Sequence, residues 1–191
     1  MPFGVTNALA QFMRMMNDLL GEYLDIFVLI FLDDILVYSR SVEEHAEHLR
    51  KVLHKLREYR LYAKASKCEI LKTSLEFLGH EVTVDGMAPI EQKLKAVREW
   101  ERPRDVTSLR SFLGFANYYR RYVQGYAHVA NPLKELTKKG VPFQWGPYQR
   151  RAFVQLKDAL CTAPILQYPD PSLPYVVVMD ASQFAVGGVL M

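Results

Sequence analysis

The chain has 191 residues, half of them hydrophobic, and its 24 Lys and Arg against 21 Asp and Glu give a net charge of +3. This length and apolar content suffice for one large or two small folded domains and exclude an intrinsically disordered chain. The longest apolar run, Ile26 to Leu32, is far shorter than the roughly 20 residues of a membrane-spanning helix.

The two cysteines, Cys68 and Cys161, lie far apart and form no CxxC motif. Because there is no disulfide framework, a reducing intracellular compartment is expected. The first residues lack a signal-peptide pattern, and the last residues stop inside an expected strand. We therefore expect a piece of a longer protein.

The first half of the chain alternates helical and strand-like patterns. Apolar residues recur at helical spacing in residues 7–20 and 43–59. Residues 24–32 and 35–38 are rich in Ile, Val, Leu, Phe and Tyr, which predicts two strands. Residues 67–90 are β-prone and are interrupted by glycines, which predicts two small hairpins.

The second half of the chain is helical and then β-rich. Helices are predicted near 91–100, 106–123, 128–138 and 148–160, with prolines at the joints, and strands at 174–180 and 185–190. The segment from Ile90 to Gly140 has 11 Lys and Arg against 5 Asp and Glu, a net of +6 that leaves −3 for the remainder. Such a segment is typical of polyanion binding and also of solvated helices. The order of elements predicts an α+β fold.

Asp33 and Asp34 are adjacent carboxylates inside an otherwise apolar run. Neighbours in a strand point to opposite faces, so two Asp that face one site must lie at a tight turn, here the tip of a hairpin. Apolar surroundings raise the cost of their repulsion, so we expect one of them to be protonated or a cation to lie between them. Mg²⁺ prefers carboxylate oxygens and adds phosphates as ligands. The alternative is an exposed Asp-Asp turn whose charges face water.

Residues 110–122 separate into two helical faces at about 100° per residue. The core face is apolar: Phe112, Phe115, Tyr119 and Tyr122. The opposite face is polar: Arg110, Gly114, Asn117 and Arg121. A glycine lets the backbone approach a polyanion while guanidinium groups reach phosphates, although a merely solvated face is the alternative.

His45 and His48 stand three residues apart on a predicted helix. Two further ligands with suitable spacing are absent from the sequence, so a solvated helix face is favoured over a zinc site.

Several stretches resemble, in the same order, the reverse transcriptases of Ty3/gypsy-type LTR retrotransposons. "FLDDILVYS" is similar to the catalytic hairpin, with Phe31 where tyrosine is commoner, and "MPFGVTNALAQF" is similar to the PFG-x-x-NAP motif. "EFLGHEVTVDG" resembles the primer-grip hairpin, and "LRSFLGFANYYRRYV" resembles the thumb helix. "PDPSLPYVVVMDAS" looks like the lead into an RNase H domain. The resemblance covers essentially the whole chain.

The resemblance implies a role for each matched residue. Asp33 would be a direct Mg²⁺ ligand and Asp34 a supporting one, with Mn²⁺ as a substitute ion, and Asp180 would be the first RNase H carboxylate. The template and nucleotide side would be lined by Pro2, Phe3, Gly4, Asn7, Phe31 and Lys67. The primer grip would be Phe77, Leu78, Gly79 and His80. The duplex would lie on Arg110, Gly114, Asn117 and Arg121.

From the residues alone, several of these positions have ordinary structural explanations. The motif around Gly4 fits a turn that enters a helix, and Lys67 fits a surface lysine. Phe77 to His80 fits the end of a core strand, and Asp180 fits a strand-end cap.

The resemblance also implies a division of the chain and a set of partners. Residues 1–86 would be the later reverse transcriptase palm, 87–146 the helical thumb and connection, and 147–191 the start of an RNase H-like domain. Expected partners are an RNA template, a DNA primer, their hybrid and dNTPs, in a cytoplasmic particle or the nucleus and without a membrane. The third palm carboxylate and the later RNase H carboxylates would lie outside the chain, so we expect it to be inactive alone. The rival interpretations are a non-catalytic nucleic-acid-binding remnant and a decayed element without function.

Overall fold

A computed structural model of the chain describes residues 7–170, 172–182 and 186–190. Pro2, Phe3 and Gly4, which were predicted to line the template side, lie outside the described residues. The elements are small sheets and helices in mixed order, which confirms the predicted α+β class. None of the described helices is long and apolar enough to cross a membrane.

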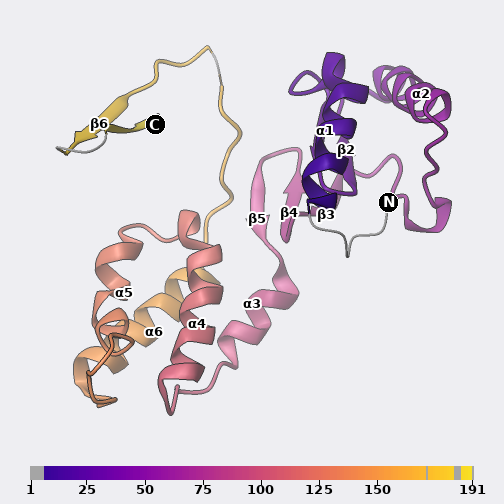
Figure 1. Cartoon of the computed structure of the whole chain (residues 1–191). Helices are drawn as coiled ribbons and strands as arrows, with labels where there is room; N and C mark the ends of the chain where they lie inside the picture. Colours follow the sequence, from indigo (N-terminus) through magenta and orange to yellow (C-terminus); the bar gives the residue numbers. More distant parts are fainter. Residues whose placement is uncertain (1–6, 171, 183–185, 191) are drawn as a thin grey trace.

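The N-terminal group places a hairpin between two helices (Figure 1). Its elements are α1 (Ala8–Leu20), the 3₁₀ helix η1 (Gly21–Tyr23), β1 (Val28–Phe31), β2 (Asp34–Val37) and α2 (Val42–Glu58). The apolar stripes of both helices bury against the hairpin in one cluster: Met16, Leu19, Leu20, Phe27, Val28, Val52 and Leu56. The Ser41 side chain caps α2 by accepting a hydrogen bond from the Glu44 amide, and acidic residues occupy the first turn.

A three-stranded antiparallel meander follows the short 3₁₀ helix η2 (Ala65–Lys67). Its strands are β3 (Ser74–Phe77), β4 (His80–Thr83) and β5 (Met87–Pro89), in the order β3-β4-β5. The two predicted hairpins are present, and they share β4 as a common strand.

A helical block forms the second core. Its elements are α3 (Glu91–Arg98), α4 (Val106–Tyr118), the 3₁₀ helix η3 (Arg120–Tyr122), α5 (Tyr126–Glu135) and α6 (Pro147–Cys161). Apolar side chains of all four α-helices meet in one buried cluster, which includes Val97, Phe112, Leu133 and Leu156. Asp105 begins α4 with a capping box that it shares with Ser108. The sequence predicted a single helix over residues 106–123. The predicted end was wrong, because α4 stops at Tyr118 and the chain continues as η3.

The chain after α6 runs back to the meander. The Met87 amide donates to the Leu166 carbonyl, the Leu166 amide donates to the Met87 carbonyl, both at 2.8 Å, and together they form an antiparallel bridge. The last elements, β6 (Val177–Ala181) and β7 (Val186–Leu190), pair as a hairpin that lies apart from the helices in Figure 1. The domain boundaries predicted from the sequence stay a prediction, although α6 shares its core with α3, α4 and α5.

Candidate nucleic-acid interface

The Asp pair lies at the tip of the β1–β2 hairpin. Phe31 pairs with Asp34, so Leu32 and Asp33 form a two-residue connection, and Leu32 has a φ of +54°. The Leu32 amide lies 2.8 Å from the Met13 Sδ, which ties the tip to α1. The tight turn predicted from the sequence is therefore present, and it brings Phe31, Asp33 and Asp34 together.

The carboxylates of Asp33 and Asp34 are both exposed to water. Repulsion between neighbouring charges is small where water screens it, so neither protonation nor a bound cation is required to keep the pair folded. Of the two alternatives that the sequence left open, the structure matches the exposed Asp-Asp turn, because the core cluster of the N-terminal group ends before the tip. The donor chemistry still fits a hard cation. Mg²⁺ takes one or two carboxylates from a protein and completes its octahedron with water and substrate phosphates.

The described residues contain no group of three or more His, Cys, Asp or Glu that could hold a metal ion by itself. Asp33 and Asp34 would therefore supply two ligands of an incomplete set. Asp180, the predicted RNase H carboxylate, lies on β6 opposite Gly187. Strand β6 lies apart from β2 in Figure 1. The predicted catalytic carboxylates thus belong to two separate places in the structure.

The remaining residues predicted near the nucleotide are spread over several elements. Asn7 precedes α1 with a φ of +64°, a left-handed conformation that Asn tolerates better than most residues. The ring of Phe31 is 49% exposed, and Lys67 ends η2 on the surface. These positions are open to a ligand, and their roles stay predictions.

The turn between β3 and β4 is the predicted primer grip. Leu78 and Gly79 both have positive φ, +47° and +70°, which is the type I′ geometry that suits a two-residue hairpin. A Cβ at Gly79 would lie 2.7 Å from the Tyr118 hydroxyl and 3.2 Å from Lys93 Nζ. The positive φ favours glycine here, and a larger residue would also have to displace the Tyr118 hydroxyl.

Three tyrosines from α4 and η3 hold this turn. The Tyr118 hydroxyl donates to the Leu78 carbonyl oxygen, and the Tyr119 hydroxyl donates to the Gly79 carbonyl oxygen at 2.7 Å. The Tyr122 hydroxyl lies 3.0 Å from His80 Nδ1.

The sequence placed Tyr119 and Tyr122 in the core and missed these contacts. The available signal was the residue type, because a buried tyrosine hydroxyl needs a partner that a phenylalanine does not.

The imidazole of His80 is enclosed by these rings. It stacks on Tyr118 with centroids 5.3 Å apart and meets Tyr119 edge-on at 5.4 Å. Burial, and then the charges of Lys93 and Arg121, lower the pKa of His80. His80 is therefore neutral at physiological pH, and its Nδ1 can accept a hydrogen bond from Tyr122.

The two predicted faces of the thumb helix are present in α4. Phe112, Tyr119 and Tyr122 are buried, and Phe115 is half-buried against the same cluster. Arg110, Gly114 and Asn117 are exposed on α4, and Arg121 is exposed on η3. A Cβ at Gly114 would meet no atom within 4 Å, so open space adjoins the helix backbone at this point.

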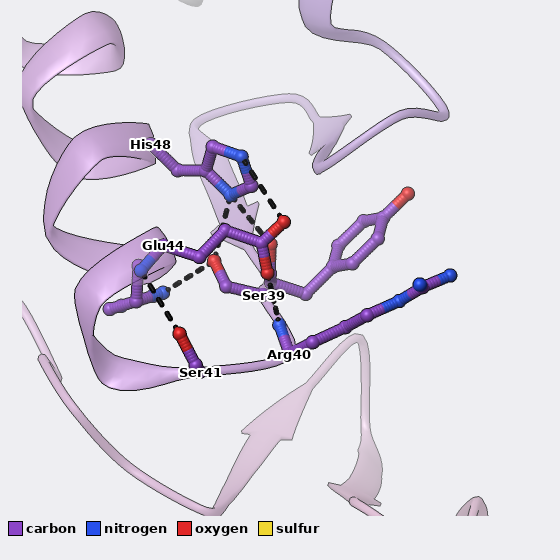
Figure 2. A network of polar contacts seen from close by, with 7 residues as sticks. Ser39, Arg40, Ser41, Glu44 and His48 are labelled. Carbon is purple, nitrogen blue, oxygen red and sulfur yellow. Dashed lines mark hydrogen bonds and ion pairs between the residues drawn. The ribbon is translucent and has the colours of Figure 1, made fainter.

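His45 and His48 belong to a polar network at the start of α2, shown in Figure 2. The Ser39 hydroxyl lies 3.0 Å from His45 Nδ1 and 2.8 Å from His48 Nδ1, while Glu44 accepts from the Arg40 amide at 2.7 Å. The His48 ring also stacks on Phe27 with centroids 3.8 Å apart. These partners give both histidines a structural role in joining β2 to α2.

Comparisons with known proteins match the N-terminal and C-terminal parts of the chain to two families that occur together in reverse transcriptases. Residues 1–82 match the family model "Reverse transcriptase (RNA-dependent DNA polymerase)", and residues 145–191 match "RNase H-like domain found in reverse transcriptase". The chain is 35% identical over 190 residues to the Transposon Tf2-3 and Tf2-7 polyproteins of Schizosaccharomyces pombe. It is covered completely in these alignments and spans 14% of the length of those relatives.

Solved structures agree with these matches. The foamy viral protease-reverse transcriptase dRH in complex with double-stranded DNA superimposes with a TM-score of 0.83 at 28% identity, over 95% of this chain and 32% of that one. The same viral protein in complex with an RNA/DNA hybrid gives a TM-score of 0.79 at 28% identity, over 95% of this chain and 25% of that one. Residues 1–82 therefore belong to the reverse transcriptase family and residues 145–191 to the RNase H-like domain found in reverse transcriptases, and over its whole length the chain is similar to retrotransposon polyproteins.

Proposed function

We propose that this chain supplies the metal-binding hairpin, the primer grip and the duplex-binding helix of an RNA-directed DNA polymerase with an associated RNase H. The observation that carries the proposal is the pair of exposed carboxylates at a two-residue hairpin tip, Asp33 and Asp34, in a chain that is similar throughout to reverse transcriptases. The foamy viral relatives are complexes with double-stranded DNA and with an RNA/DNA hybrid, which supports nucleic acid as the partner.

The residues of the hairpin tip would hold divalent metal. Divalent metal held there would supply charge stabilisation for phosphoryl transfer. Asp33 and Asp34 would orient this metal through carboxylate oxygens, and Phe31, Asn7 and Lys67 would adjoin the incoming dNTP. Asp180 would serve the separate RNase H site, which would cut the RNA strand of the hybrid.

The meander and α4 would hold the nucleic acid. The β3–β4 turn at Leu78, Gly79 and His80 can press on the sugar–phosphate backbone of a primer without reading its sequence. Arg110 and Arg121 would bind duplex phosphates, which releases counterions and makes binding depend on salt. An intracellular place of action, in a cytoplasmic particle or the nucleus, is part of the same proposal.

Primer extension tests the proposal. The chain is compared with a version extended at both ends along its reading frame, on an RNA template with a DNA primer and Mg²⁺. We expect extension by the longer version, and loss of about two or more orders of magnitude in the Asp33→Asn variant. Asp18→Asn, which removes an exposed carboxylate from α1, is the matched control and should keep full activity.

The competing function is nucleic-acid binding without catalysis. The exposed face of Arg110, Gly114, Asn117 and Arg121 would serve such binding without any metal. Tight hybrid binding with no extension by the longer version would establish it in place of the polymerase.

A further inference from the structure

The contacts between the helical block and the β3–β4 turn join parts of the chain that are 40 residues apart. Tyr119 donates to the Gly79 carbonyl oxygen at 2.7 Å, and Tyr122 lies 3.0 Å from His80 Nδ1. Carbonyl groups at the tip of a two-residue hairpin usually face water, because the turn has no neighbour beyond it. Here the turn has specific donors, so its position is set by another element.

The donors are themselves held firmly. Tyr119 is 1% exposed and Tyr122 is 4% exposed, and both rings belong to the core cluster of the helical block. Burial raises the pKa of Tyr119 to about 12 and raises that of Tyr122 as well. Both hydroxyls keep their protons at physiological pH, as exposed tyrosines also do, and the burial of their rings holds them in place against the turn.

The same short stretch of chain carries the opposite, exposed face. Arg110, Gly114 and Asn117 project from α4 away from the core, while Tyr119 anchors the turn from the core side. Tyr119 follows α4 directly, so its hydrogen bond to the Gly79 carbonyl oxygen links the end of α4 to the β3–β4 turn.

We propose that Tyr119 and Tyr122 are positioning residues, which fix the β3–β4 turn against α4 and thereby set where a primer end lies relative to the duplex on the exposed face. This role rests on the proposed function, because it takes the turn and the exposed face as nucleic-acid contacts. Neither tyrosine touches the reacting atoms in this role. Each acts through the backbone of Gly79 or the ring of His80.

The test replaces each hydroxyl while keeping the ring. Tyr119→Phe, Tyr122→Phe and the double variant are prepared in the full chain. Tyr126→Phe is the matched control, because the Tyr126 hydroxyl donates to the Leu113 carbonyl oxygen inside the helical block and does not reach the turn. Circular dichroism and urea unfolding establish that each variant is folded.

Two measurements separate positioning from simple stability. Amide hydrogen exchange at Leu78, Gly79 and His80 reports the hold on the turn, and loss of one hydrogen bond should accelerate it about two- to tenfold. Hydroxyl-radical footprinting on an RNA/DNA hybrid with a recessed DNA 3′ end reports where the primer end lies. We expect the double variant to keep hybrid affinity within about threefold and to lose the sharp edge of the footprint at the primer end.

The outcomes distinguish the two proposals. Sharp footprints that end at the same nucleotide in wild type and double variant would overturn the positioning role, and so would unchanged exchange at the turn. A blurred edge in Tyr126→Phe as large as that in Tyr119→Phe would also overturn it, because the effect would then come from the core alone. Failure of the wild-type chain to bind the hybrid would instead overturn the proposed function, and the positioning role with it.

Discussion

Arg110 donates a hydrogen bond from its guanidinium Nη2 to the carbonyl oxygen of Thr137 at 3.0 Å. A side chain expected at the duplex therefore also ties α4 to the residues that follow α5. Arg121, the other expected phosphate ligand, has no ion pair among the described residues. The two arginines should respond differently to substitution.

We expect Arg121→Ala to weaken hybrid binding and to reduce the salt slope of log K by about one, because one phosphate contact is lost. Arg110→Ala should give the same change in slope and also lower the free energy of unfolding by about 0.5–1.5 kcal/mol through the lost Thr137 contact. Affinity measured across a salt series, with urea unfolding alongside, checks both effects.

The control for this pair is Arg151→Ala, which removes an exposed positive charge from α6. Its salt slope should match that of wild type. An unchanged slope in the Arg110→Ala, Arg121→Ala double variant would refute the assignment of this face to the duplex.

A substitution at Gly114 should change helix stability and duplex binding in opposite directions. A Cβ at this position meets nothing within 4 Å, so Gly114→Ala should stabilise α4 by about 0.5–1 kcal/mol. If a duplex lies against the helix backbone here, the added methyl group should weaken hybrid binding although the protein becomes more stable. Urea unfolding and hybrid affinity of the same sample test this opposition, and a gain in both quantities would contradict a close approach at Gly114.

Hydrophobic spacing was sufficient to predict the helices and the two faces of α4, because burial follows apolar periodicity. It could not locate the end of α4. Tyr119 and Tyr122 are three residues apart, a spacing that fits an α-helix and a 3₁₀ helix equally well. The Tyr122 hydroxyl in η3 contacts His80, a residue 42 positions away, and no local pattern encodes such a contact.

The sequence also predicted the Asp33–Asp34 pair only in part. The sequence placed Asp33 and Asp34 correctly at a hairpin tip, because a tight turn is the one place where strand neighbours share a side. The apolar flanks left two alternatives open, an apolar site and an exposed turn, and the sequence could not decide between them. The strands are only four residues long, so the tip extends past the cluster that buries Val28 and Phe27.

Gly86 permits the bridge between the meander and the segment after α6. Its φ is +145°, and a Cβ there would lie 2.2 Å from the Leu166 carbonyl oxygen. Gly86→Ala should break the Met87–Leu166 bridge and lower the free energy of unfolding by about 1–3 kcal/mol.

Limited proteolysis checks the same variant. Cleavage after Leu166 should become faster, because a second contact of this segment would also be lost. The Tyr168 hydroxyl donates to the Thr83 carbonyl oxygen at 2.9 Å. Gly21→Ala is the control, since Gly21 has a helical φ of −54° and open space around it. Equal stability and equal proteolysis of the two variants would contradict a structural role for the bridge.

His80 should make stability depend on pH. Burial, followed by the charges of Lys93 and Arg121, lowers the pKa of His80 below its ordinary value of 6.5. In the unfolded chain the imidazole binds a proton as pH falls through 6.5, whereas in the folded protein it stays neutral to lower pH. Proton binding then favours the unfolded state, so this contribution to stability is full above that pH and is lost progressively below it.

The urea midpoint between about pH 8 and about pH 5 measures this effect. We expect the wild-type midpoint to fall on the acid side and the His80→Gln variant to show a flatter profile. His128→Gln, which removes an exposed histidine from α5, should keep the wild-type slope. If His80→Gln and wild type lose stability in parallel as the pH falls, the proton is taken up elsewhere, and the neutral imidazole is not what joins the β3–β4 turn to Tyr122.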